Sequence, residues 1–283
     1  MSNLGFHCHN LDLFDEMILG NGLRRGEFYN LRANELHRLK RLVTLHKLEW
    51  SIHAPLVQLD WYSQPPTWSF LCDPDKDKRE LTMKMIMLSM EHAEELGAEY
   101  LVVHFPSPIA EEHNENKAKL ESIARKSCDR LAELSLKRKV SIHIEGVGAS
   151  PLIDADFILS VLKNYSPHLS YCFDTAHTHL AAIDNGFDLY EFEAALLPYL
   201  GSVHLWNTRG KSDYQSFRHI PVHPSQGSEK GWVDIARVLK IMGSAKSSLP
   251  IIFENDRFYP EELGDYDYRE GVKWVRALVA TLS

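Results

Sequence analysis

Short apolar runs alternate with longer amphipathic stretches along the whole chain. The apolar runs predict strands at 4–7, 27–29, 48–53, 100–104, 140–145, 169–174, 202–205 and 251–254. Apolar residues recur at helical spacing in 11–19, 34–45, 79–96, 112–136, 154–162, 189–197, 232–242 and 271–282. This alternation is typical of a parallel sheet with crossover helices. We therefore predict a single (β/α)₈ TIM barrel domain over residues 1–283.

Two long segments interrupt the alternation, at 54–78 and 206–231. Loops of this length inside a compact domain are usually functional or disordered. The first contains four prolines and the aromatic residues Trp61, Tyr62, Trp68 and Phe70. We expect both loops to lie over the C-terminal mouth of the barrel. The first would either form a packed lid or only cover the rim.

The composition describes an ordinary globular protein, with 44% hydrophobic and 25% charged residues among 283. A net charge of −8 gives no overall attraction to nucleic acid, although a local basic patch would suffice. The four cysteines are scattered and form no CxxC pair, which argues against disulfides and thiolate zinc sites. Nothing resembles a signal peptide or an uncharged membrane span, so we expect a cytoplasmic protein with no membrane partner.

Besides the strand at 4–7, which ends in His7, six predicted strands carry a metal-capable side chain at or next to their C-terminal end. These residues are His53, His104, Glu145, Asp174, His204 and Glu254. The C-terminal ends of parallel barrel strands meet at one mouth, where active sites of this architecture lie. A buried carboxylate without a partner is costly or becomes neutral, so three acids at one mouth favour a bound cation. His177, three residues after Asp174, is expected to face the same ion.

Carboxylate and imidazole ligands without thiolates suit Zn²⁺, Mn²⁺, Fe²⁺ or Mg²⁺. Helix capping or salt bridges are the alternative for Glu145, Asp174, His204 and Glu254. His53 and His104 could instead be hydrogen-bonded pocket histidines that bind no metal.

The remaining histidines have less specific settings. His177 lies beyond its strand and would equally suit a substrate contact. His219 lies in a loop without periodic context, and His7 would line the mouth as a hydrogen-bonding group. His143, which alternates with Glu145, is expected to face the helices. His179 and His223 are given no role.

The ordered set of motifs resembles the xylose isomerase-like barrel superfamily, which joins sugar isomerases and epimerases with endonuclease IV (AP endonuclease family 2). The matching stretches are Ile52-His53-Ala54-Pro55, Val102-Val103-His104, Ile144-Glu145, Phe173-Asp174-Thr175-Ala176-His177, Val203-His204-Leu205, Arg218-His219 and Phe253-Glu254. The resemblance covers nearly the whole chain.

In the isomerase branch, the resemblance implies one divalent ion on Glu145, Asp174, His204 and Glu254. Glu145 and Glu254 would be the catalytic acid and base, moving a proton between carbons through an enediolate. His177 would hold a substrate hydroxyl. Arg209, in Asn207-Thr208-Arg209-Gly210, would reach the substrate.

In the endonuclease IV branch, the resemblance implies three zinc ions. The first would be held by His53, His104 and Glu145, the second by Glu145, Asp174, His204 and Glu254, and the third by His177 and His219. The third ion also needs an aspartate where this chain has Phe217, and Asp213 is the alternative acid in the same loop. The branch's tyrosine at the damaged DNA site is Leu56 here.

These observations favour a metal-dependent sugar isomerase or epimerase, with one to three ions per chain and a small sugar or polyol as substrate. An endonuclease IV-like zinc phosphodiesterase acting on DNA is the main alternative. A related dehydratase and a non-catalytic sugar-binding barrel are further alternatives. Retention of all four core ligands argues against the last of these.

Overall fold

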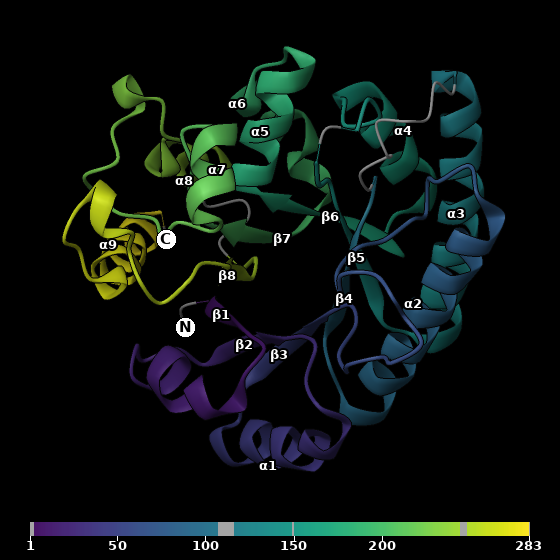
Figure 1. The fold of residues 1–283 in the computed structure, drawn as a ribbon, viewed down its shortest axis with the longest axis horizontal. Coiled ribbons are helices and arrows are strands. Elements are labelled where there is room, and N and C mark those ends of the chain that lie inside the picture. Colours follow the sequence, from purple (N-terminus) through teal and green to yellow (C-terminus); the bar gives the residue numbers. More distant parts are fainter. Residues whose placement is uncertain (1–2, 107–115, 149, 244–247, 283) are drawn as a thin grey trace.

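In a computed structural model of the protein, eight parallel strands close into one barrel that is surrounded by helices (Figure 1). The structure describes residues 3–106, 116–148, 150–243 and 248–282. The strands are β1 (Leu4–Cys8), β2 (Arg25–Phe28), β3 (Glu49–His53), β4 (Tyr100–His104), β5 (Ser141–Glu145), β6 (Leu169–Asp174), β7 (Leu200–Leu205) and β8 (Ile251–Phe253). They follow one another in chain order, and β8 pairs with β1 to complete the ring. The predicted barrel is confirmed.

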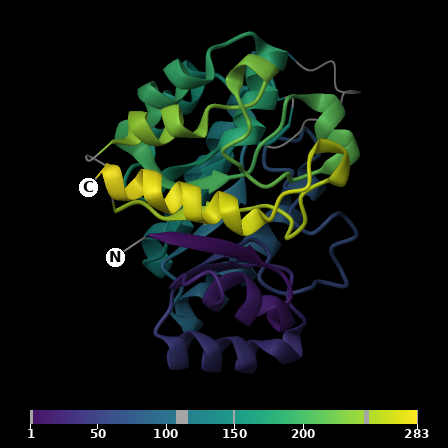
Figure 2. The same cartoon turned by 90° about the vertical axis from the view of Figure 1, so that its left-hand side faces the viewer.

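The helices are α1 (Leu36–His46), α2 (Lys76–Leu96), α3 (Lys117–Arg138), α4 (Ala155–Tyr165), α5 (Thr175–Asn185), α6 (Leu189–Leu196), α7 (Lys211–Phe217), α8 (Ile235–Met242) and α9 (Tyr268–Thr281). None of the helices in the described residues is long and apolar enough to cross a membrane. Figure 2 shows α9 lying along the barrel beside β1, where the ring of Tyr268 packs edge-on against Phe6 with 5.9 Å between ring centroids.

Most predicted helices are present, with boundaries shifted by a few residues. The stretch at 11–19 is helical but irregular, with a 3₁₀ turn (Leu11–Leu13) followed by a π-helical turn (Asp15–Leu19). The predicted start of the helix at 112–136 lies outside the described residues. Two helices were not predicted: α5 begins directly after β6, and α7 lies inside the segment expected to be a loop at 206–231.

Several strands are unusually polar on the face that points into the barrel. Buried polar side chains on this face include Arg25, Glu27, Ser51, His143 and Ser202. Barrels of this type are more often filled by branched apolar residues. The apolar residues of the intervening positions face the helices instead, as Ile142 and Ile144 do on β5.

The prediction that His143 faces the helices is wrong. Its Nδ1 lies 2.9 Å from Ser202 Oγ, and its ring stacks on Tyr100 with centroids 4.0 Å apart. The reason is geometric, because residues two apart on a strand share a face. His143 therefore points the same way as Glu145, one layer deeper in the barrel.

At the N-terminal end of the strands, the buried side chain of Arg25 lies across the end of the barrel. Its buried guanidinium contacts Glu49 at 2.6 Å and Glu99 at 2.8 Å. Polar groups at this end of a TIM barrel usually serve stability. The metal-capable residues lie at the opposite end.

The segment at 54–78 packs largely on the outer helices. The ammonium of Lys84 on α2 lies 4.2 Å from the ring centroid of Trp61. The Tyr62 hydroxyl is 3.2 Å from Thr82 Oγ1, and Ser127 of α3 donates a hydrogen bond of 2.6 Å to the Leu71 carbonyl. These contacts anchor the segment to α2 and α3.

Candidate metal centre and active site

Four strands deliver a ligand group to one point at the mouth of the barrel. Glu145, Asp174, His204 and Glu254 each offer one atom, and these atoms lie within 4.8 Å of one another. Nδ1 of His204 is 2.7 Å from Glu254 Oε2 and 3.4 Å from Glu145 Oε1. The pairing of β6 with β7 places Asp174 directly opposite His204. Three carboxylates therefore converge on one imidazole nitrogen.

Asp174 also caps a helix, which was the alternative considered from the sequence. Its Oδ1 accepts the backbone N–H of His177 at 2.6 Å, at the start of α5. Its Oδ2 accepts Nε1–H of Trp206 at 2.7 Å. Burial, together with the charges of Glu145 and Glu254, raises the pKa of Asp174 well above its ordinary value. A cation in the group would reverse that effect, since it favours the carboxylate.

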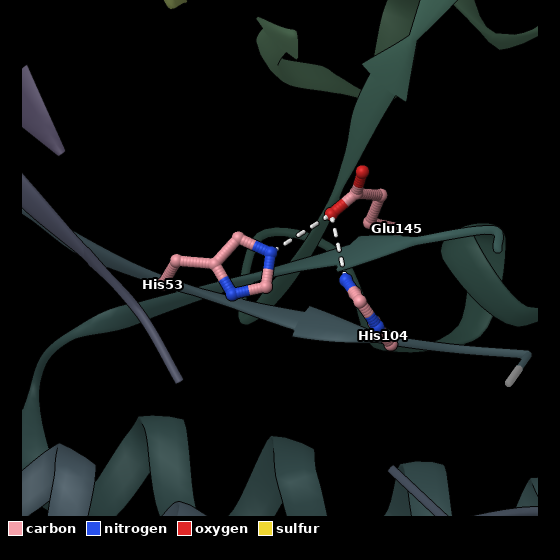
Figure 3. A group of neighbouring side chains, drawn as sticks. All are labelled: His53, His104 and Glu145. Atoms are coloured by element: carbon pink, nitrogen blue, oxygen red, sulfur yellow. Dashed lines mark hydrogen bonds and ion pairs between the residues drawn. The ribbon is translucent and has the colours of Figure 1, made fainter. Parts of the chain in front are cut away.

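Glu145 also belongs to a second ligand group, with His53 and His104 (Figure 3). Nε2 of His53 and Nε2 of His104 lie 3.3 and 3.6 Å from the same oxygen, Glu145 Oε2. The other oxygen faces His204. Burial opposes a charge on Glu145, but the neighbouring His204 and His53 hold its pKa well below the ordinary value. Glu145 is thus a carboxylate shared between the group of Asp174, His204 and Glu254 and the group of His53 and His104.

The chemistry of these groups fits a divalent cation. Glu145 Oε1, Glu254 Oε2 and His204 Nδ1 are buried, and none has an aligned hydrogen-bond partner. Such atoms are rare in folded proteins unless a ligand satisfies them. Cys172 lies close to Glu145 and His204, but burial raises the pKa of its thiol to about 12, so it is a neutral neighbour rather than a thiolate.

His7 lines the cavity at the mouth. Its Nδ1 is 3.3 Å from Glu254 Oε1, and its ring stacks on Tyr29 with centroids 4.1 Å apart. Burial lowers the pKa of His7 to about 3, so the imidazole is neutral at physiological pH. It is therefore suited to exchange hydrogen bonds with a substrate.

His177 and His219 also reach the mouth, where they contact each other and the Trp206 ring. Their ring centroids are 5.8 Å apart, and His219 stacks on the Trp206 ring at 4.3 Å. No group of metal-capable side chains in the described part of the chain includes either histidine. Asp213 is engaged elsewhere, because both of its oxygens bind Arg209. Metal binding by His177 and His219 stays a prediction.

The two arginines near the seventh strand have different settings. Arg209 donates to Asp213 at 2.7 and 2.9 Å and lies over the Trp232 ring. Arg218 lines the cavity at the mouth and lies over Tyr214, with a backbone φ of 57° that non-glycine residues rarely adopt. Arg218 is therefore the arginine of this pair that faces the site.

The cavity above the metal-capable residues has a volume of about 500 Å³. Its walls include His7, Tyr29, Arg218, His219, Glu254 and Arg257. Glu254 lines this cavity, whereas Glu145 is fully buried and does not contribute to its walls. A small molecule in the cavity would meet Glu254 first.

Sequence reasoning missed one charged residue of this region, Glu27 on β2. It is fully buried, and its Oε1 lies 2.9 Å from Nε2 of His204. A signal was present, because Arg25 and Glu27 are two apart while Gly26 and Phe28 alternate with them. This pattern places both charges on the face that points into the barrel.

Comparison with known proteins agrees with this architecture. Residues 7–278 match the family described as xylose isomerase-like TIM barrel. A D-tagatose 3-epimerase-like protein of known structure is 17% identical, with a TM-score of 0.74 over 100% of this chain and 98% of that chain. The structure of an IolI protein with a bound zinc atom is 16% identical, with a TM-score of 0.70 over 100% and 99%.

Among characterised sequences, apurinic-apyrimidinic endonuclease 1 of Saccharomyces cerevisiae is 25% identical over 208 residues. The match covers 68% of this chain and 54% of the yeast protein. The chain thus spans about half the length of this relative.

Proposed function

The chain belongs to the xylose isomerase-like TIM barrel family, and on this basis we propose that it is a divalent-metal-dependent isomerase or epimerase of small sugars or polyols. The observation that carries the proposal is the group of Glu145, Asp174, His204 and Glu254 beneath the cavity. Its volume of about 500 Å³ lies within the range of small-molecule pockets. Relatives in fold include a D-tagatose 3-epimerase-like protein, which supports this substrate class.

Zn²⁺, Mn²⁺, Mg²⁺ or Fe²⁺ held by the four ligands would polarise the carbonyl and hydroxyl oxygens of a bound sugar. Glu254, which faces the cavity, then removes the proton from the carbon beside the carbonyl, and an enediolate forms. Glu254 can return its proton to the adjacent carbon, whereas a proton for the opposite face would come from Glu145, which must first take one up from water because the carboxylate itself has none to give. The first outcome is aldose–ketose isomerisation, and the second is epimerisation.

Proton transfer at carbon gives a direct test. Ketoses and aldoses incubated with metal-loaded protein in heavy water should gain deuterium at the carbon beside the carbonyl, detected by NMR or mass spectrometry. If no sugar in a broad panel gains deuterium, the proposed chemistry is wrong.

Arg218, rather than Arg209, is expected to bind the substrate. Arg218→Gln should raise KM about tenfold or more, because a hydrogen bond to a charged group contributes about 1.5–3 kcal/mol. Arg209→Gln is the matched control and should leave KM unchanged, since Asp213 already binds that guanidinium. Steady-state kinetics of the two variants decide the assignment, and the reverse pattern would restore Arg209 as the substrate arginine.

A second function is favoured by a specific observation, the group of His53, His104 and Glu145. Two ions sharing Glu145 would suit phosphodiester hydrolysis by activated water. The yeast endonuclease relative supports this reading. Against it, Phe217 packs beside an apolar cluster and Leu56 is fully buried, so neither can replace the residues of that branch.

The nuclease reading is tested with a DNA duplex containing one abasic site, at low salt. Incision that depends on added zinc, with no deuterium incorporation into sugars, would replace the isomerase proposal. An intact duplex after incubation with one to three equivalents of zinc would remove the nuclease.

A further inference from the structure

Glu27 is a buried acid that the proposed proton transfer does not use. Its Oε2 accepts a hydrogen bond of 2.8 Å from Ser51 Oγ, and its Oε1 lies 2.9 Å from Nε2 of His204. All three side chains are fully buried. Glu27 is paired with His7 on β1 and with Ser51 on β3, so the strand register itself places it beneath the mouth.

His204 has acids on both of its ring nitrogens. Nε2 faces Glu27, whereas Nδ1 faces Glu254 and Glu145 in the four-ligand group. A carboxylate beside one nitrogen of a metal-binding histidine keeps the proton there and leaves the other lone pair for the metal. The Nε2–H bond of His204 does not point directly at Glu27 Oε1. We therefore attribute the interaction mainly to attraction between charges rather than to a hydrogen bond.

Among the described residues, His204 is the basic side chain with which Glu27 forms an ion pair. Arg25, two residues earlier on the same strand, already binds Glu49 and Glu99 at the far end of the barrel. His143, the next histidine inward, contacts Ser202. Glu27 is therefore a buried acid whose carboxyl group faces His204.

We propose that Glu27 is a positioning residue that directs Nδ1 of His204 toward the ion and strengthens divalent-metal binding at the four-ligand group. The inference rests on the metal site of the proposed function and not on its sugar chemistry. It gives the site a fourth carboxylate that never touches the ion or the substrate.

The test measures metal affinity by competition with a chromophoric chelator, using Zn²⁺ and Mn²⁺ as probes. Glu27→Gln removes the charge with little change of shape and should weaken affinity about 10–100-fold. Ser51→Ala keeps the charge and removes its hydrogen bond, so a smaller loss is expected. Thermal unfolding without metal, measured in parallel, separates a loss of affinity from a loss of fold.

Glu193→Gln is the matched control. Glu193 lies on α6, fully buried, and burial raises its pKa to about 9. At pH 7 it is neutral, so glutamine imitates it in shape and charge. Its metal affinity should equal that of the unchanged protein.

A second measurement uses ¹⁵N NMR of the imidazole of His204 in zinc-loaded protein. Ligation through Nδ1 with a proton on Nε2 is expected, and ligation through Nε2 would overturn the proposal even if Glu27→Gln does not fold. Unchanged affinity in Glu27→Gln would also overturn it, as would a lack of zinc and manganese binding by the unchanged protein. Metal binding without deuterium incorporation into sugars would overturn the sugar chemistry alone.

Discussion

Glu254→Gln is expected to reduce deuterium incorporation into the substrate by about 10²–10⁴-fold, the range typical of general acid–base catalysis. The reason is that Glu254 is the carboxylate exposed to the cavity, and an amide cannot accept a proton from carbon. NMR of the product after incubation in heavy water measures the effect. Metal must be present at saturation, because the substitution also weakens one ligand of the ion.

Glu193→Gln serves as the control for this prediction, since that side chain is buried on α6 away from the site. If the Glu254→Gln variant still binds sugar but no longer turns it over, Glu254 acts as a catalytic base. Unchanged behaviour of the variant in every assay would instead favour a sugar-binding barrel without catalysis.

Asp174→Asn is expected to remove the tightly bound ion, with a loss of affinity beyond the 10–100-fold or so typical of an outer partner. The substitution replaces an anionic ligand at the four-ligand group with a neutral one. His104→Ala should leave that ion in place, because His104 lies outside the four-ligand group and faces the other oxygen of Glu145. Elemental analysis of protein purified without chelator, combined with affinity measurements, gives the number of ions per chain.

The opposite result, with the ion lost in His104→Ala and kept in Asp174→Asn, would mean that the primary site is the group of His53, His104 and Glu145. Two or three zinc ions in the unchanged protein would reverse the order of the two proposed functions. One manganese, magnesium or iron would favour the isomerase.

Much of the site was predictable because its residues end apolar strands. An apolar run that stops at Glu145 or Asp174 marks both a strand and its C-terminal end, and parallel closure brings such ends together. No long-range contact had to be known for this step. The order of the motifs along the chain indicated further candidate residues, such as His177 and His219.

Other features required knowledge of side-chain direction. Glu27 lies in mid-strand, where an acid ordinarily suggests solvent exposure, and only the polar face of β2 indicated otherwise. The error at His143 came from assigning to opposite faces two residues that share one. Arg209 was given a substrate contact from its motif, while its pairing with Asp213 depends on the unpredicted helix α7.

The order of the strands has a consequence for how the protein matures. Glu254 directly follows β8, the strand that closes the ring against β1. Until that strand docks, the nascent chain cannot bring Glu145, Asp174, His204 and Glu254 together, so binding of the proposed ion should coincide with completion of folding. An ion that binds only the closed barrel then stabilises it by about 2.7 kcal/mol at a concentration of 100 Kd. Metal supply in the cell would in this way influence how long each finished chain survives.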